Sequence, residues 1–325
     1  SETIWGASNA YASWVQSLSQ ARITSSDPDA IKTPPADNES IRSTLSPPIH
    51  IAEMFYSNNG VPIEEDINYD YANRLTKLRT VTDKDRFYLK KDYETIQLNF
   101  DREPRFYADL GFDGGIWFGQ GLYNDSKTWF LQAKAGQFGA RLGAALFSVT
   151  GYWPKKLVNY LSVLDVGSPK FEGFRLPIIR LSGLYLLYAE ALNESLAIPS
   201  AEVYTYIDKV RERAGLQGVK ESWATYAKDP GAPLDKNKLR AIIHKERRIE
   251  LCFEGQIGWD LRRWKELQDI LSRPFQGWTV SQSNAVDYYR PQTVAVPVFG
   301  VKDYLWPIRN TEVVINEKLV QNPFW

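Results

Sequence analysis

The run of residues 246–255 constrains the fold of this chain more than any other segment, because it alternates charged pairs with large apolar side chains and ends on Gly255. Apolar residues at helical spacing precede it, and together they predict one helix over 236–253. Glu246 and Glu250 are four residues apart and therefore share a face of that helix. Because buried charges persist only when they are paired, we interpret these carboxylates as part of an ion network between helices, not as an acid–base pair.

Three further segments predict helices and place the chain in the mainly α class. Residues 178–193 are apolar on nearly every side, so we expect a buried helix there. Pro199 suits the first turn of the next helix, which should stop at Gly215. The apolar face of this second helix consists of Val203, Ile207, Val210 and Ala214. A shorter helix is expected over 260–271. Helix pairs of this kind stack in solenoid proteins, although no second copy of a repeat unit is visible.

The remaining segments lack a long periodic pattern, and their compositions predict shorter elements and loops. We expect strand and loop over 1–23, a proline-rich loop over 25–48, one or two short helices over 75–91, a strand running into a turn over 147–154, a loop over 216–235 and an extended tail over 304–325. We therefore expect a loop-rich region over 1–177 and a helical scaffold with a tail over 178–325.

Composition excludes several classes of function. Lys and Arg number 39, and so do Asp and Glu, so the formal charge is zero and gives no electrostatic case for binding nucleic acid. Cys252 is the single cysteine, which excludes an intramolecular disulfide. The two histidines are His50 and His244; His244 and Cys252 would lie about 12 Å apart along one helix, too far to share a metal ion. We predict no metal site, no cofactor and no catalytic residue.

Aromatic side chains provide the best candidate for a binding site. Five of them cluster in a glycine-rich, loop-like stretch, and a sixth candidate lies earlier in the chain; the set is Trp117, Phe118, Tyr123, Trp129 and Trp153, with Tyr71 as the sixth. Flat, electron-rich rings suit the C–H faces of sugars, and binding residues concentrate on loops. Gln120, Asn124, Asp125 and Lys127 are nearby to bond hydroxyl groups. The alternative is that some of these rings fill the core beneath the loops.

Several motifs, in order along the chain, resemble the SusD/RagB family of outer-membrane nutrient-binding lipoproteins. They are the turn 59–63, the Arg-Glu-Pro-Arg-Phe-Tyr motif at 102–107, the Tyr-Ala-Glu-Ala-Leu helix at 188–192, the segment 210–216, the Glu-Arg-Arg run at 246–248 and the closing pieces 305–308 and 321–323. Glu103 stands where the family usually has Asp, and Ile257 occupies a position that is commonly Arg, which removes one expected ion pair.

The resemblance implies a SusD-like fold with tetratricopeptide-like helix pairs, of which this chain corresponds to the C-terminal portion. It also implies non-catalytic capture of an oligosaccharide at the extracellular face of the outer membrane, and delivery to a TonB-dependent, SusC-like porin. The lipid anchor would belong to an N-terminal half that this chain lacks.

Three alternatives remain open at this stage. A peptide could replace the glycan as the ligand of the same fold. A glycoside hydrolase would use two carboxyl groups; the candidates are Glu64, Glu65, Asp66, Asp109 and Asp113. A structural helical adaptor would bind no small ligand.

Overall fold

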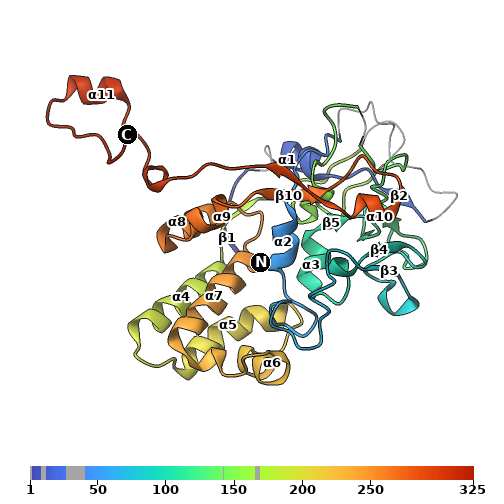
Figure 1. Ribbon diagram of the computed structural model, residues 1–325, viewed down its shortest axis with the longest axis horizontal. Coiled ribbons are helices and arrows are strands. Elements are labelled where there is room, and N and C mark those ends of the chain that lie inside the picture. The colour runs from blue at the N-terminus through green and yellow to red at the C-terminus, as the bar shows by residue number, and fades with distance from the viewer. Residues whose placement is uncertain (1, 9–11, 27–40, 142, 165–168) are drawn as a thin grey trace.

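The structure is a computed structural model that describes residues 2–8, 12–26, 41–141, 143–164 and 169–325. Most of the proline-rich loop expected over 25–48 lies outside the described residues. The helical part of the chain follows residue 180 and comprises α4 (Leu181–Ser195), α5 (Ala201–Arg213), α6 (Val219–Tyr226), α7 (Lys236–Glu250), α8 (Ile257–Trp264) and α9 (Leu267–Leu271). Helix α4 packs against both α5 and α7, and these helices form one side of the molecule (Figure 1). The mainly α class with helix pairs is confirmed.

Helix α7 forms for the reasons that its sequence indicates. The Asp235 side chain caps its first turn by accepting hydrogen bonds from the backbone N–H groups of Asn237 and Lys238. Its apolar stripe, Leu239, Ile242 and Ile243, is buried as expected. The predicted face of α5 is buried too, and Gly215 ends that helix with φ +76°.

Three expectations for the helical part differ from the structure. Helix α4 is not buried all round, because α5 and α7 cover only part of its circumference; Leu184 and Leu187 are each 43% exposed. The loop expected over 216–235 contains α6, whose Trp223 and Val219 are buried against the core. Tertiary burial therefore stabilises a helix that the loop-like composition concealed. The helix expected over 260–271 is divided at Lys265, which has φ +61°, into α8 and α9.

The loop-rich part is built from short elements. Its helices and 3-10 turns are α1 (Ala12–Ser19), α2 (Ile49–Met54), η2 (Asp83–Asp85), η3 (Gln97–Asn99), α3 (Pro104–Asp109) and η4 (Lys155–Leu157). Its strands are β1 (Thr3–Gly6), β2 (Thr24–Ser25), β3 (Leu78–Thr80), β4 (Glu94–Ile96), β5 (Gly111–Phe112), β6 (Ile116–Trp117), β7 (Trp129–Phe130), β8 (Tyr152–Trp153) and β9 (Pro177–Arg180). In the helical part, the 3-10 turn η5 (Ala232–Leu234) lies between α6 and α7. The elements after α9 are β10 (Phe275–Trp278), α10 (Ala285–Tyr288), β11 (Pro291–Ala295), η6 (Val301–Tyr304) and α11 (Asn310–Ile315).

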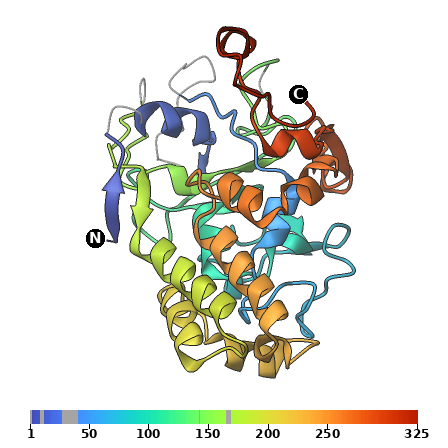
Figure 2. The same cartoon turned by 90° about the vertical axis from the view of Figure 1, so that its left-hand side faces the viewer.

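The strands pair antiparallel in small separate sheets rather than in one large sheet. The pairs are β1 with β9, β3 with β4, β5 with β8 and β10 with β11, and β7 lies between β2 and β6. Figure 2 shows β1 alongside β9 at one edge of the molecule, next to the start of α4. Of the one or two short helices expected over 75–91, the segment contains only the 3-10 helix η2, beside the strand β3. The strand and loop expected over 1–23 include helix α1.

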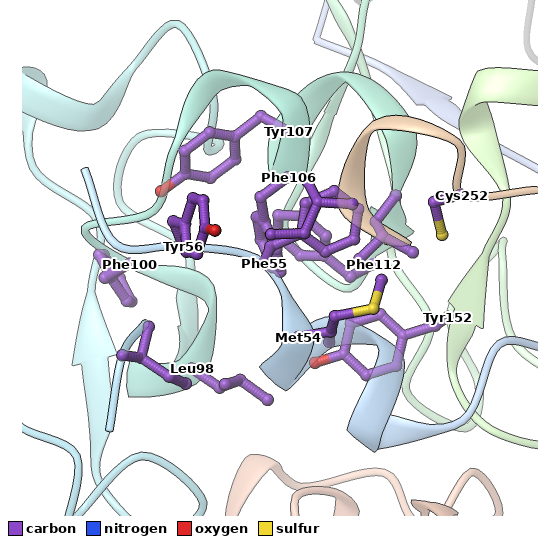
Figure 3. Packing of buried hydrophobic residues seen from close by; sticks show 14 of the residues in the cluster. Met54, Phe55, Tyr56, Leu98, Phe100, Phe106, Tyr107, Phe112, Tyr152 and Cys252 are labelled. Atoms are coloured by element: carbon purple, nitrogen blue, oxygen red, sulfur yellow. The ribbon is translucent and has the colours of Figure 1, made fainter. Parts of the chain in front are cut away.

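One hydrophobic cluster holds the two parts together. It contains Phe55, Phe106 and Tyr152 from the loop-rich part and Ile207 and Ile249 from the helices. Figure 3 shows the aromatic centre of this cluster, with Cys252 at its edge. Cys252 is buried and free, as a chain with one cysteine requires.

The C-terminal tail runs away from this body (Figure 1). It was expected to be extended, and it is irregular apart from η6 and α11. Tyr304 fastens its start, because the Tyr304 hydroxyl donates to the carbonyl oxygen of Lys265 at 3.0 Å. Within the part of the chain that is described, no helix combines the length and the apolar character needed to cross a membrane.

Candidate functional site: an aromatic groove beside a buried ion cluster

A buried ion cluster lies between α7 and the loop-rich part, and we define it as Glu103, Arg105, Arg180, Arg211, Glu246 and Glu250. Arg105 bonds Glu103 and Glu246 at 2.7 Å and Glu250 at 3.1 Å. Arg211, which is fully buried, bonds Glu246 at 3.1 Å. The structure therefore has the interhelical ion network that the spacing of Glu246 and Glu250 predicted.

Burial and charge act in opposite directions within this cluster. Burial raises the pKa of Glu103. Burial also opposes the charged form of Glu250, but Arg180, Arg105 and Arg213 outweigh it and lower the pKa of Glu250 to about 2. Both glutamates bond arginines and lie inside the protein, so their arrangement is that of a structural tie.

The cluster also joins the motifs that are far apart in the sequence. The Arg211 guanidinium donates to the carbonyl oxygen of Gly60 at 2.8 Å, which brings the turn 59–63 onto α5. Gly60 has φ +74°, and a Cβ there would lie 2.7 Å from Arg211 Nη2. The turn therefore needs glycine, both for its backbone conformation and for the space that the guanidinium occupies.

Beside the ion cluster lies a groove of about 620 Å³, which we name the aromatic groove. Its volume is within the range of small-ligand sites, about 300–1,000 Å³. It is lined by Phe87, Tyr88, Pro104, Tyr107, Ala108, Asp109, Ile116, Trp117, Phe118, Lys155, Lys156, Val158 and Tyr160. These residues come from α3, β6, η4 and the loops that follow η2, β6 and η4, so the groove is assembled from segments of the loop-rich part.

Four of the rings that line the groove remain open to solvent. Phe87, Tyr88, Phe118 and Tyr160 are between 43% and 55% exposed. The rings of Phe118 and Tyr160 lie 6.0 Å apart at 32°. Tyr88 stacks on the buried ring of Tyr107, with centroids 4.2 Å apart and an angle of 13°. The groove thus combines flat exposed rings with a fixed aromatic floor.

The loop that carries Phe118 is fixed by the backbone next to Tyr160. The Gln120 N–H donates to the Tyr160 carbonyl oxygen at 2.8 Å, and the Trp129 indole donates to the Gln120 carbonyl oxygen at 3.0 Å. Gly119 has φ +86°, and a Cβ on it would lie only 2.1 Å from the Tyr160 carbonyl oxygen. The two rings are therefore held in place by backbone contacts and by glycine.

Two adjacent lysines, Lys155 and Lys156, contribute positive charge to the groove. Lys156 bonds Glu254 at 2.9 Å and Asp109 at 3.4 Å. Burial alone would lower the pKa of Lys156, but Asp109 and Glu254 reverse this and raise it. Burial raises the pKa of Asp109 to about 6 despite Lys156.

The ammonium of Lys155 has different partners. It donates to the carbonyl oxygens of Tyr107 at 2.5 Å and Ile116 at 2.9 Å, which ties α3 to β6. Among the residues that the structure describes, it is paired with no carboxylate. Burial lowers the pKa of Lys155 to about 8, with Asp109 acting in the opposite direction.

The structure separates the aromatic residues singled out in the sequence. Phe118 and Tyr123 are exposed, at 51% and 52%, whereas Trp117, Trp129 and Trp153 are each 2% exposed. Trp117 forms part of the groove wall, Trp129 holds the loop, and the Trp153 indole donates to the Ser43 hydroxyl at 2.6 Å. The expectation of five ligand-facing rings is therefore revised, because the faces of the three indoles pack in the core.

Tyr71 lies apart from this group. It is partly buried against the core, with the Arg74 guanidinium 3.9 Å from its ring centre, and it does not line the groove. Tyr123 packs edge-on against Phe118, with centroids 6.0 Å apart, and so extends the exposed aromatic surface.

Sequence reasoning missed Phe87, Tyr88, Tyr160 and Lys155. Phe87 and Tyr88 fall in a segment that was expected to be helical, which hid them as ordinary helix residues. The adjacent pair of rings, in a short polar stretch, was the available signal. For Tyr160 and Lys155 no local signal exists, since only the tertiary fold brings η4 to the loop of Phe118.

Metal binding finds no support in this arrangement. Across the described residues, no group of three or more His, Cys, Asp or Glu side chains could hold a metal ion. His244 instead stacks on Trp264 at 3.7 Å and bonds Glu266 at 2.8 Å.

Comparison with known proteins identifies relatives along the whole chain. The sequence model of the SusD family matches residues 1–325. SusD-like protein P2 of Formosa agariphila is 33% identical over 145 residues, which are 44% of this chain and 24% of that protein. SusD-like protein P25 of the same organism is 36% identical over 138 residues, 42% of this chain and 23% of that protein.

Solved structures give the same result for the fold. The structure of BT4246 in its selenomethionine form superposes with a TM-score of 0.77 and 26% identity, covering 100% of this chain and 52% of that one. A SusD-like protein of Bacteroides fragilis, BF3747, has a TM-score of 0.61 and 24% identity, covering 86% and 47%. The chain thus spans about half the length of these structures.

Proposed function

This chain belongs to the SusD family, and from that membership together with the aromatic groove we propose that it binds an oligosaccharide without transforming it. The observation that carries the proposal is the pair Phe118 and Tyr160, two half-exposed rings fixed side by side in a groove of ligand size. Such rings match the C–H faces of sugars, and the backbone contacts of their loop keep them in position before a ligand arrives.

Binding without catalysis agrees with the charges in the groove. Hydrolysis of a glycoside usually requires two carboxyl groups on opposite sides of the scissile bond. Among the described residues that line the groove, Asp109 is the single carboxyl, and Lys156 lies 3.4 Å from it. Of the other acidic candidates from the sequence, Asp113 accepts bonds from Lys134 at 2.6 Å and Tyr289 at 2.8 Å inside the core.

Family membership supports a location and a role for the bound glycan. We propose that the protein acts at the extracellular face of the outer membrane, as a lipoprotein of this family would, and passes its glycan to a TonB-dependent, SusC-like porin. Uptake of a labelled glycan by cells with and without the gene tests this role. Equal uptake in both strains would contradict it.

The binding proposal is tested by titration of the protein with a panel of oligosaccharides in a calorimeter. Phe118→Ala and Tyr160→Ala should each weaken binding by about tenfold or more, the effect of removing a central aromatic contact. Trp14→Ala is the matched control, because Trp14 is 53% exposed but lies on α1 outside the groove. Tyr71→Ala tests the candidate ring that lies outside the groove, and it should leave glycan binding unchanged if the groove is the binding site.

The outcomes divide the candidate functions clearly. Equal loss in the Trp14 variant, or loss in the Tyr71 variant alone, would contradict the groove as the binding site. If peptides bind saturably and no glycan binds, the ligand class is peptide and not glycan. Products released from a glycan would overturn the assignment as a non-catalytic protein.

A further inference from the structure

The two lysines of η4 differ in how their charges are balanced, although they are adjacent in sequence. Lys156 has two carboxylates within 3.4 Å, Asp109 and Glu254, and it also donates to the Glu250 carbonyl oxygen at 2.8 Å. Lys155 donates to two backbone carbonyl oxygens and, among the described residues, to no carboxylate. Among the described lining residues, the groove therefore contains two ammonium groups and a single carboxyl group, Asp109, which lies 3.4 Å from Lys156.

An ammonium group has three N–H donors. The carbonyl oxygens of Tyr107 and Ile116 accept two of those of Lys155, and they also fix the ammonium at the groove, where Lys155 is a lining residue. One donor remains for an acceptor inside the groove. Carbonyl oxygens carry only a partial charge, so they leave the full charge of a partly buried ammonium without a counter-charge.

The charge of Asp109 acts on Lys155 and raises the pKa of that lysine against burial, but among the described residues the carboxyl forms its ion pair with Lys156 and none with Lys155. The Asp109 carboxyl faces Lys156, and burial keeps its pKa near 6, so part of its negative charge is lost in mildly acidic solution. The other carboxylates nearby, Glu250 and Glu254, are bonded to Arg180 at 2.5 Å and 2.6 Å. Among the described residues no carboxylate bonds Lys155, so its free donor is available to a negative group of a ligand.

We propose that the aromatic groove takes a glycan bearing an acidic group, a carboxylate or a sulfate, and that Lys155 binds this group while Phe118 and Tyr160 contact the sugar ring. The inference rests on the proposed glycan binding and narrows its ligand class. A hydrogen bond between an ammonium and an anion is about twice as strong as one between neutral groups. The same contact selects against neutral sugars, which leave the lysine charge unbalanced.

The test uses matched pairs of ligands that differ only in the acidic group. The whole chain is titrated with oligogalacturonate and with the neutral galactose oligomer of equal length, and separately with a sulfated galactan oligomer and its desulfated form. We expect the acidic member of at least one pair to bind about tenfold tighter at low salt, the contribution of one charge-assisted hydrogen bond. This preference should shrink as salt is added.

Two variants assign the preference to a residue. Lys155→Gln removes the charge and keeps a donor, so it should abolish the preference for the acidic member of the pair. Far-UV circular dichroism and thermal unfolding, compared with those of the wild type, show whether the variant folds. Lys84→Gln is the matched control, because Lys84 is 78% exposed, does not line the groove and changes the net charge equally. It should keep the preference.

The two ligand pairs identify the source of the anion, since a preference in one pair alone assigns the carboxylate or the sulfate. Equal binding of acidic and neutral oligomers, lost in Phe118→Ala, overturns this inference and leaves the proposed function intact. An acidic preference that survives Lys155→Gln overturns the role of Lys155. No binding of any glycan, with the chain folded, overturns both proposals.

Discussion

The ion cluster and the aromatic groove adjoin each other, yet the charged side chains in them have different kinds of partner. In the ion cluster each buried carboxylate bonds an arginine, as Glu246 does with Arg105 and Arg211. In the groove Lys155 bonds only backbone carbonyl oxygens among the described residues. Charges that balance one another hold helices and loops together, whereas a charge without a protein counter-charge remains available to a ligand.

The same contrast applies to the aromatic residues. Trp117, Trp129 and Trp153 are buried, and the Trp129 indole bonds the loop that follows Phe118, while Phe118 and Tyr160 themselves are half-exposed. Supporting side chains and contacting side chains are therefore different residues. Variants that remove one kind or the other separate stability from binding.

The largest expected effect comes from breaking the ion cluster. Glu246→Ala leaves Arg105 and Arg211 buried without this partner, so we expect it to lower the free energy of unfolding by about 3–5 kcal/mol. Urea unfolding measures this change. The control, Glu317→Ala, removes an exposed carboxylate on the tail and should leave the unfolding midpoint unchanged. A loss below about 1 kcal/mol, typical of a surface pair, would contradict the structural role of the cluster.

A second variant pair separates support from contact in the aromatic region. Trp129→Ala should lower the free energy of unfolding by about 3–5 kcal/mol, because it empties a buried site and removes the bond to Gln120. Phe118→Ala should change it by about 0.5 kcal/mol or less, since this ring is half-exposed, but should weaken glycan binding. Thermal or urea unfolding together with calorimetric titration checks both. Equal stability losses would show that Phe118 also supports the fold.

A glycine pair tests whether the groove depends on the close approach of its two loops. Gly119 and Gly121 both have φ +86°, so alanine strains the backbone at each position by about 1 kcal/mol. At Gly119 the new Cβ would also lie 2.1 Å from the Tyr160 carbonyl oxygen, whereas at Gly121 the nearest atom, on Val163, is 3.4 Å away. Gly119→Ala should therefore destabilise more and weaken glycan binding, while Gly121→Ala should only destabilise. Identical binding losses would contradict the groove geometry.

The last prediction is a pH dependence that distinguishes the two lysines. Burial lowers the pKa of Lys155 to about 8 from 10.5 in the unfolded chain, with Asp109 opposing. Between these pH values the unfolded chain retains a proton that the folded protein has released, so Lys155 makes the free energy of unfolding rise with pH. The free energy of unfolding of the wild type minus that of Lys155→Met, measured by urea unfolding, should therefore increase from pH 8 to pH 10.

Lys156→Met provides the opposite case. The pKa of Lys156 is raised because Asp109 and Glu254 outweigh its burial. Its stabilising contribution is thus present below pH 10.5 and is lost only as the pH rises further. The free energy of unfolding of the wild type minus that of Lys156→Met should stay nearly constant from pH 8 to pH 10. If this free-energy difference were also constant for Lys155→Met, the pKa of Lys155 would not be lowered in the folded protein.

Local sequence predicted those elements whose pattern and burial agree. Helices α5 and α7 form where their apolar stripes predict them, since the same residues that set the period, such as Ile207 and Leu239, are those that become buried. The sequence did not reveal α6, because its composition is loop-like and only the burial of Trp223 stabilises it. Nor did it reveal β3, which forms by pairing with β4.

The sequence by itself determined the family, because several of the motifs that identify it supply the buried ion cluster and its glycine turn, where charge pairing and positive φ restrict the residue types. It also showed that a glycine-rich segment dense in aromatic residues follows Gly115. Only the tertiary structure decided which rings face solvent and which lysine lacks a carboxylate. The reason is that exposure and charge balance depend on segments that are distant in sequence, as when η4 brings Lys155 to the carbonyl oxygens of Tyr107 and Ile116.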